Sequence, residues 1–181
     1  ASQLRMIAGG TIGTADPVTA LVEQNLNAID TEVGTVAAQS ATGIYIQELA
    51  AGGDLIVGNV PATTVTVNVQ EVEFRSTTSL VTETRSLSEL NDLETTDNGP
   101  IKVIVEAGTL TITEGDDNDN VGVRANGLGN VLLRAYGPGS DIIVTDDLGV
   151  NGEARILSTA GHITLRAADE ISLTARVSTG G

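Results

Sequence analysis

The chain has 181 residues and carries 24 Asp and Glu against 9 Lys and Arg, which gives a formal net charge of −15. A polyanion of this size repels nucleic-acid phosphates and acidic membranes, and no apolar run approaches the roughly 18 residues of a membrane span, so we expect neither nucleic-acid binding nor membrane insertion. Cysteine and Trp are absent and only two Tyr and one Phe occur. This composition excludes disulfides, thiolate metal sites and a cysteine nucleophile, and it argues against aromatic sugar-stacking platforms.

The first half of the chain predicts strands interrupted by two irregular stretches. Alternating aliphatic residues predict strands over residues 4–8, 44–48 and 65–74. Residues 22–32 are more polar, and the segment from 76 to 98 shows no strand alternation. Within the latter, Leu87, Leu90 and Leu93 are spaced by three after Ser86, which predicts one or two helical turns capped by the serine. We therefore expect two excursions from the regular fold, at about 15–42 and 76–98.

The second half repeats a five-residue unit, aliphatic-x-aliphatic-x-Ala. It recurs at 103–107, 121–125, 131–135, 163–167 and 171–175, and residues 4–8 are a sixth copy. Alternation of this kind places two large apolar side chains and a small one on the same face, which is typical of half-buried strands, and directs the intervening arginines into water. Those arginines are Arg124, Arg134 and Arg166. The predicted core includes Val103, Val121, Val131, Ile142, Ile163 and Leu165.

The spacing of these strands predicts their architecture. One series begins at residues 121, 142 and 163 and another at 110, 131 and about 154, so each advances by about 21 residues. A period of this size indicates a solenoid, and the sequence predicts an all-β chain that forms a parallel β-helix, or β-solenoid, with coils of about 21 residues. The alternative is an antiparallel β-sandwich, in which Asn126 and Gly127 would form a hairpin turn.

The two ends of the chain continue the same rhythm. If Ala1 were placed after Gly181, Leu4 would follow Ile163 by about one further period. We therefore expect residues 1–181 to form a single solenoid module without capped ends, stacking head to tail in a homopolymer or as tandem repeats. The candidate residues of the contacting ends are Leu4, Met6, Ile12, Ile171, Leu173 and Val177.

The densest group of oxygen ligands lies between two predicted strands, at residues 114–120. Hard cations such as Ca²⁺ bind carboxylate and carbonyl oxygens in flexible turns, so Glu114, Asp116, Asp117 and Asp119 are candidate calcium ligands. The segment lacks the spacing of an EF-hand loop, and a solvated turn between two strands explains it equally well. No cofactor is required by the sequence, and calcium is the one candidate.

Several observations argue against catalysis. Lys102 is the only lysine, no serine lies in a Gly-x-Ser-x-Gly elbow, and the acidic residues concentrate in turns rather than on a sheet face. We therefore expect the chain not to be an enzyme, although parallel β-helices also occur in polysaccharide-cleaving enzymes.

Short segments of the first half resemble a known family. These are Leu4 to Val18, with Ala-Gly-Gly, Ile-Gly and Pro-Val in order, then Gly43-Ile44-Tyr45-Ile46, then Leu55 to Val60. They resemble the filamentous-haemagglutinin-like β-strand-repeat modules of very large bacterial surface proteins. The resemblance implies a right-handed β-solenoid, secreted or displayed on a bacterial cell surface, that serves as a stalk, fibre or adhesin.

Together these observations predict a structural subunit or repeat of an extracellular fibre or surface stalk. The alternative is a ligand-binding adhesin whose site lies in the two excursions, and a polysaccharide-cleaving enzyme is the third candidate. The identity of a host or matrix ligand does not follow from the sequence.

Overall fold

The computed structural model describes residues 2–15, 25–72, 78–147 and 152–180. The described residues contain strands and no helix, and therefore no helix long and apolar enough to cross a membrane. They divide into two compact units, one made of residues 1–60 and 91–181 and the other of residues 61–90.

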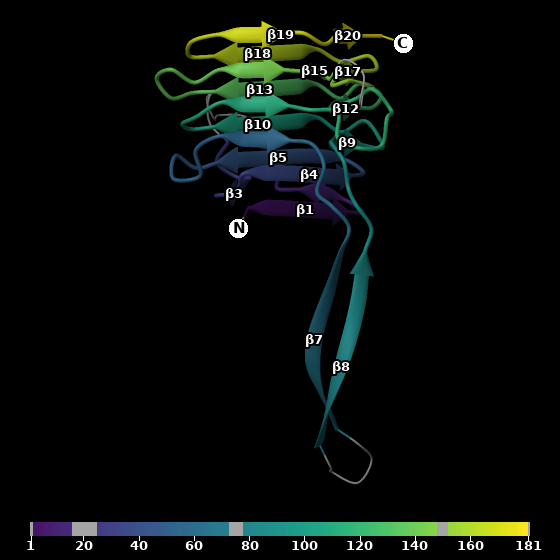
Figure 1. Cartoon of the computed structure of the whole chain (residues 1–181). Coiled ribbons are helices and arrows are strands. Elements are labelled where there is room, and N and C mark those ends of the chain that lie inside the picture. Colours follow the sequence, from purple (N-terminus) through teal and green to yellow (C-terminus); the bar gives the residue numbers. More distant parts are fainter. Residues whose placement is uncertain (1, 16–24, 73–77, 148–151, 181) are drawn as a thin grey trace. The chain divides into compact units, whose positions relative to one another are not determined.

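The first unit consists of short strands stacked mostly in parallel (Figure 1). We call its six-stranded sheet sheet 1; it follows the order β18-β13-β10-β5-β2, and β3 also pairs with β5. The strands of sheet 1 are β2 (Thr11–Ile12), β3 (Ile29–Thr31), β5 (Gly43–Glu48), β10 (Ile101–Val105), β13 (Val131–Ala135) and β18 (Ile163–Ala167).

The ten-stranded sheet, sheet 2, divides at its longest strands. β1 (Gln3–Ala8) pairs along its whole length with β4 (Thr35–Ser40), and the two ends of β4 pair with different strands, β6 and β9. Branch 2a contains β6 (Leu55–Val57), β11 (Leu110–Ile112), β14 (Ile142–Val144) and β19 (Ile171–Leu173). Branch 2b contains β9 (Leu93–Thr95), β12 (Val123–Ala125), β17 (Ile156–Ser158) and β20 (Val177–Thr179).

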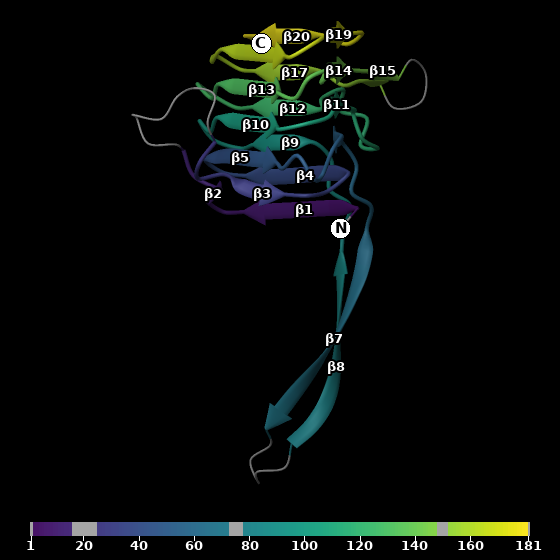
Figure 2. The same ribbon diagram turned by 90° about the vertical axis from the view of Figure 1, so that its left-hand side faces the viewer.

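From β5 onward the chain visits branch 2a, branch 2b and sheet 1 in turn, and we call one such circuit a coil. Figure 2 shows the strands of successive coils stacked on one another. Curled sheets of mostly parallel strands are compatible with the predicted β-solenoid, and parallel pairing excludes the antiparallel sandwich. The antiparallel exception in this unit is the short pair β15 (Asp146–Asp147) and β16 (Gly152–Glu153).

The structure does not confirm the predicted coil length, because most coils are longer than the sequence period. Asn130 and His162, which directly precede the paired strands β13 and β18, are hydrogen-bonded across 32 residues of chain. Asp141 and Glu170, which precede β14 and β19, are joined in the same way across 29 residues. An interval close to the predicted one separates β17 from β20, where the intervening loops are short.

The error has a simple geometric cause. The starting points 142 and 163 belong to β14 and β18, and residue 121 closely precedes β12, so the three lie in branch 2a, sheet 1 and branch 2b. Strands with the same alternating pattern follow one another at short intervals, and three of them complete a coil. The period of about 21 residues in the sequence therefore corresponds to two of the three strands of a coil.

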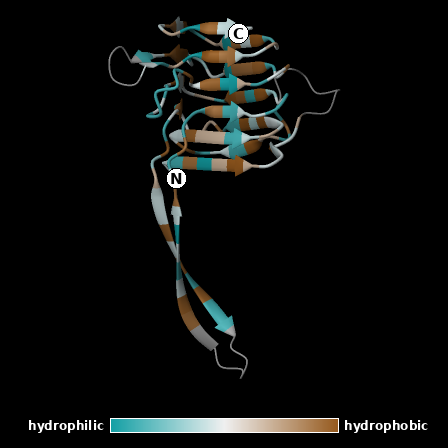
Figure 3. Ribbon diagram, turned by 90° about the vertical axis from the view of Figure 1, so that its right-hand side faces the viewer, coloured by the Kyte–Doolittle hydropathy of each residue, from teal (hydrophilic) through white to brown (hydrophobic). Residues whose placement is uncertain are grey.

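The predicted core residues lie inside the first unit. Val103, Val121, Val131 and Ile142 are buried, while Ile163 and Leu165 of the last strand of sheet 1 are partly buried and pack against the same cluster. Figure 3 shows hydrophobic residues recurring along the stacked strands. Most strands of sheets 1 and 2 contribute aliphatic residues to a continuous core, and β10 and β13 contribute three each. The burial of a given strand therefore depends on the coils on both sides of it.

Threonine side chains tie successive coils together at the end of branch 2a. The hydroxyl groups of Thr113, Thr145 and Thr174 donate hydrogen bonds to strand carbonyls one coil earlier, those of Val57, Ile112 and Val144, at 2.9, 3.0 and 3.0 Å respectively. Each of these carbonyls also accepts the backbone N–H of the same threonine. One oxygen thus accepts two bonds at each step, and the ladder continues past the strands into the corner.

Asparagine and aspartate side chains perform a similar role at other corners. Asp54, Asn98, Asn130 and Asp141 accept the backbone N–H groups of Thr109, Leu128, His162 and Glu170, at 2.7, 3.0, 2.7 and 2.9 Å. Every pair joins adjacent coils. Polar turn residues therefore satisfy backbone donors that would otherwise lack a partner in the corner.

The segment expected to form the first excursion contains regular strands. β3 and β4 both lie within residues 15–42 and pair in sheets 1 and 2, whereas residues 16–24 lie outside the described part of the chain. The strand β4 has the sequence Thr-Val-Ala-Ala-Gln-Ser, in which Val36 and Ala38 are buried. Small residues replace the large aliphatic ones there, so its alternation was too weak to predict a strand.

The second expected excursion, 76–98, contains two different structures. Thr78–Leu87 is strand β8, which pairs antiparallel with β7 (Thr63–Val72) to form the second unit, and Leu93 begins β9 of branch 2b. The predicted helical turns at Ser86–Leu93 are absent from the described residues, because Leu87 ends one strand and Leu93 is buried in another. The threefold spacing of the leucines was therefore not a helical period.

Candidate functional site

The acidic segment lies in the corner between β11 and β12. β11 ends at Ile112, and the next residue, Thr113, donates its hydroxyl hydrogen bond to the Val57 carbonyl of the preceding coil. The chain then leaves the sheet and re-enters it at Val123, the first residue of β12. Gly115, Asn118 and Asn120 adopt positive φ angles of 83°, 58° and 62°. These are residue types that tolerate the left-handed region, so the local sequence supports a tight and irregular loop.

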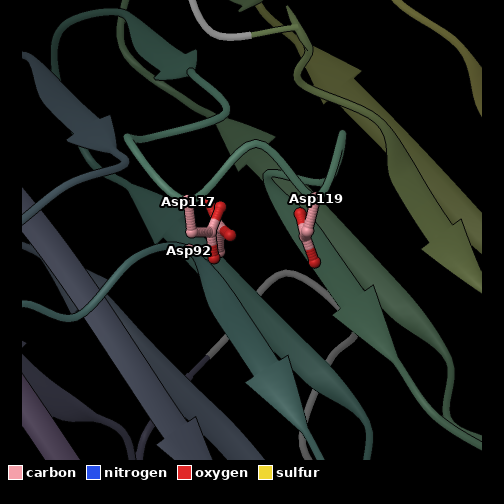
Figure 4. Close-up of side chains that lie close together, drawn as sticks. All are labelled: Asp92, Asp117 and Asp119. Atoms are coloured by element: carbon pink, nitrogen blue, oxygen red, sulfur yellow. The ribbon is translucent and has the colours of Figure 1, made fainter.

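Two of the four predicted calcium ligands come together with a third residue. Carboxylate oxygens of Asp92, Asp117 and Asp119 all lie within 4.8 Å of one another, as Figure 4 illustrates. Asp92 directly precedes β9, one coil before the loop that carries the other two. We refer to these three residues as the aspartate cluster.

The other two predicted ligands have different surroundings. Glu114 is buried beneath the loop, where its Oε1 accepts the backbone N–H of Asn120 at 3.1 Å and its Oε2 has no hydrogen-bond partner. Asp116 is exposed, and its backbone N–H donates to the Asn91 side chain at 3.1 Å. Neither carboxylate belongs to the aspartate cluster.

Asp92 is the residue of this site that sequence reasoning missed. It lies within a segment expected to be an excursion, and nothing about Asn91-Asp92-Leu93 indicated that it would meet a loop of the following coil. The signal that locates it is the pairing of Leu93 with Val123, which brings the two coils into register. The period read from the sequence does not give this register.

Burial gives Asp92 unusual acid–base properties. Its side chain is only 5% exposed, and desolvation, reinforced by the nearby carboxylates of Asp117, Asp119 and Glu114, raises its pKa to about 9. Burial also raises the pKa values of Asp117 and Glu114 above their usual range, and like charges in the loop add to both shifts. The corner therefore gathers acidic groups whose ionised forms are incompletely solvated by water.

One guanidinium group borders the cluster. Arg124, on β12, donates to Asp119 Oδ2 at 2.8 Å and to Glu94 Oε1 at 3.2 Å. These two contacts hold the side chain of Asp119 against β12. A single positive charge shared between two carboxylates does not neutralise Asp92 and Asp117 as well.

A hollow of about 540 Å³ lies along the same corner. It is lined by Asn59, Thr113, Glu114, Gly115, Asp116, Thr145 and Asp146. Its lining mixes backbone, threonine and acidic groups and includes none of the three clustered aspartates. It therefore adds no ligand to the cluster.

The predicted assembly residues lie at opposite ends of the first unit. Leu4 and Met6 belong to β1 and Ile12 to β2, at the N-terminal end of the stack. Ile171 and Leu173 belong to β19 and Val177 to β20, at the other end (Figure 1). Ile12 is buried, Leu4 and Met6 are partly buried, and the other three are exposed.

No family model matches the chain, and comparisons with curated proteins and with solved structures give no match. The resemblance to filamentous-haemagglutinin-like modules therefore stays an expectation from short segments.

Proposed function

We propose that the chain is a structural β-solenoid module, a subunit or repeat of an extracellular fibre or surface stalk, that extends by stacking end to end on a second copy of itself. The observation that carries the proposal is the match between the strand patterns at the two ends of the first unit. Neither a catalytic step nor a cofactor is part of it.

Both ends offer unpaired strand edges within the described part of the chain. At one end, β1 pairs with β4 alone, and β2 and β3 pair with β5 alone. At the other end, β18, β19 and β20 each pair with one strand of the preceding coil. Unpaired edges are templates for further strands.

The strands at the two edges are complementary in number and length. The N-terminal end presents one unbroken strand in sheet 2 and two short strands in sheet 1, while the C-terminal end presents two short strands in sheet 2 and one five-residue strand in sheet 1. Both combinations already occur inside the molecule, because β4 spans β6 and β9, and β5 spans β2 and β3. A second copy would therefore repeat pairings of kinds that the fold contains.

The side chains at the C-terminal edge support the same arrangement. Ile171 and Leu173 are 41% and 48% exposed, and Val177 is 37% exposed. Their partners one coil earlier, Ile142, Val144 and Ile156, are fully buried. One further coil would bury the exposed side chains in the same way, with a gain of roughly 25 cal/mol for each Å² of apolar surface covered.

Strand direction selects the orientation of the second copy. Stacking the N-terminal edge of one copy on the C-terminal edge of another keeps all strands parallel, as they are in sheets 1 and 2. Such a contact joins two different surfaces and does not close on itself, so it produces open filaments. A filament suits the extracellular stalk or fibre that the family resemblance implies.

The experiment combines negative-stain electron microscopy with intact-mass measurement on the same sample. Thin fibres built from an 18.5 kDa species would support non-covalent assembly, and fibres of a much larger polypeptide would support tandem repeats. Isolated particles at all concentrations and salt conditions would overturn the proposal.

Edge variants make the test specific. Leu173→Lys places a charge on the inward face of the C-terminal edge, whereas Ser172→Lys places the same charge on the outward face of the same strand. We expect the first variant to add to growing ends through its intact N-terminal edge and then stop growth, which shortens wild-type fibres in mixtures. Equal shortening by the two variants would contradict edge stacking.

A second candidate function, a ligand-binding adhesin, is favoured by one observation in the second unit. The hairpin exposes Val65, Val67 and Leu80, the last to 71%, because hydrophobic residues on a two-stranded ribbon have no core to enter. Replacement of residues 61–90 by a short Gly-Ser link separates the candidates, because an adhesin would lose ligand binding while a fibre module would still assemble.

A further inference from the structure

Three aspartates meet at the corner between two coils. Figure 4 shows the side chains of Asp92 and Asp117 overlapping in this view and that of Asp119 to one side, and carboxylate oxygens of all three lie within 4.8 Å of one another. Oxygens that share one Ca²⁺ at 2.3–2.6 Å can be at most about 5 Å apart. The separations in the aspartate cluster are therefore compatible with three carboxylates that share one ion of this size.

An unsatisfied atom provides an independent observation. The Oδ1 atom of Asp92 is buried and has no hydrogen-bond partner. An unpaired buried carboxylate oxygen costs far more free energy than one in water, so native structures supply it with a partner. This oxygen belongs to a side chain directed into the cluster.

The backbone holds Asp92 where it is. Its carbonyl accepts the N–H of Ala38 at 2.8 Å, and the next residue, Leu93, donates its N–H to the carbonyl of Gly122 at 3.1 Å. Both bonds belong to inter-coil ladders, and Leu93 is fully buried. These bonds therefore keep the backbone of Asp92 at this corner, where its side chain is only 5% exposed.

The existing positive charge is insufficient to neutralise the cluster. Arg124 contacts Asp119 and Glu94, and among the described residues no salt bridge is formed by Asp92 or Asp117. The guanidinium group of Arg124 is thus already shared between two carboxylates, those of Asp119 and Glu94. A divalent cation would supply the missing charge and the missing partner of Asp92 together.

We propose that Asp92, Asp117 and Asp119 bind a calcium ion that fastens the start of β9 to the β11–β12 corner of the following coil. Only oxygen donors are present, which selects a hard cation over zinc or copper. Three carboxylates leave several coordination positions to water, and one of the three is shared with Arg124. We therefore expect an affinity in the range of extracellular calcium modules, with Kd about 0.1–1 mM.

The proposal is independent of end-to-end assembly, because the cluster lies in the middle of the stack and contains none of the edge residues. Its test is calorimetric titration of the chelator-treated full chain with CaCl₂. The wild-type chain should bind one ion, and Asp92→Asn should weaken binding at least about tenfold by removing one charged ligand. The matched control is Asp116→Asn, which makes the same charge change in the same loop outside the cluster and should alter the affinity less than about threefold.

Melting temperatures and circular dichroism show whether a variant loses calcium binding only because it fails to fold. Calcium should raise the melting temperature of the wild type and of Asp116→Asn, and should leave that of Asp92→Asn almost unchanged, while circular dichroism shows the same strand content in all three. The proposal is overturned if wild type takes up no calcium at millimolar concentrations. It is equally overturned if Asp92→Asn and Asp116→Asn weaken binding to the same extent, which would indicate diffuse attraction to an acidic surface.

Discussion

The two units of this chain use similar residues in opposite ways. The stacked unit is built from short strands, many of which pair with segments a whole coil away along the chain and bury their aliphatic side chains completely. The hairpin unit is built from two ten-residue strands joined locally, and several of its valines and leucines remain in water. Alternation therefore predicts a strand, but burial depends on whether other strands cover it.

Glycine and turn residues mark the difference in the sequence. In the stacked unit, short strands end at corners such as Gly108 and Gly129, where the chain turns toward the next sheet. Residues 63–72 contain no glycine or proline, so the strand continues for ten residues and no corner forms. Interrupted alternation produces coils, and uninterrupted alternation produces a ribbon.

The largest expected effect is the loss of a core side chain. Leu133→Ala, in the fully buried centre of β13, should lower the free energy of unfolding by about 2–5 kcal/mol because it leaves a cavity between two coils. The matched change Leu80→Ala, on the exposed hairpin, should lower it by less than about 0.5 kcal/mol. Denaturant unfolding measures both, and comparable losses would show that the hairpin contributes to the same core.

The next effect concerns a corner. Gly108 has φ +109°, and a Cβ atom built there would lie 2.5 Å from the backbone of Gly53 in the preceding coil. Gly108→Ala should therefore cost about 1–3 kcal/mol through backbone strain, with a further contribution from the clash. Gly9→Ala, at a site where an added Cβ meets nothing within 4 Å, is the control and should be close to neutral.

A smaller effect is expected from the loss of one threonine hydroxyl hydrogen bond between successive coils. Thr145→Val keeps the shape of the side chain but removes its bond to the Ile112 carbonyl, and we expect a loss of about 0.5–1.5 kcal/mol. Thr111→Val, on the outward face of β11, should change the stability little. If both substitutions lower the free energy of unfolding equally, the hydroxyl hydrogen bond of Thr145 does not contribute to stability.

The smallest free energy concerned is that of local opening of the hairpin, which hydrogen exchange measures. A two-stranded ribbon is only marginally stable in water, so amides of peptides from residues 63–72 and 80–87 should exchange by local opening. Amides of β10 and β13 should exchange only through opening of the stack and should be protected much longer. Mass spectrometry after deuterium labelling distinguishes them, and equal protection would contradict the division into two units.

Most of the strands could be predicted from residue patterns, and their order in space could not. The sequence predicted the exact bounds of two strands, Val131–Ala135 and Ile163–Ala167. In both, the aliphatic-x-aliphatic-x-Ala unit has an arginine at its fourth position, Arg134 or Arg166. Because strands of branch 2a, branch 2b and sheet 1 share the same alternation, the pattern did not predict which strands pair with each other. The motif that carries the true spacing is the threonine directly after β11, β14 and β19, at residues 113, 145 and 174, because it recurs once in each of these coils.

The candidate site divides in a similar way. Asp117 and Asp119 were recognisable because they lie in one dense acidic turn, whereas Asp92 required the inter-coil register. Arg134 was expected in water, but it is buried beside the ring of Tyr136, with 4.3 Å from its guanidinium carbon to the ring centroid. Contacts between coils decide the surroundings of both residues, and a single pass along the sequence does not contain them.

The pairing of each strand with its neighbour one coil away has a consequence for growth in length. From β10 to β17, each strand of sheets 1 and 2 pairs with its next partner after a single coil, whichever coil it belongs to. A molecule with twice as many coils would close loops of the same size during folding, so its chain-entropy cost for each coil would not increase. Folding of such a chain can advance by adding one coil to those already formed, at a pace set by the coil and not by the length of the whole.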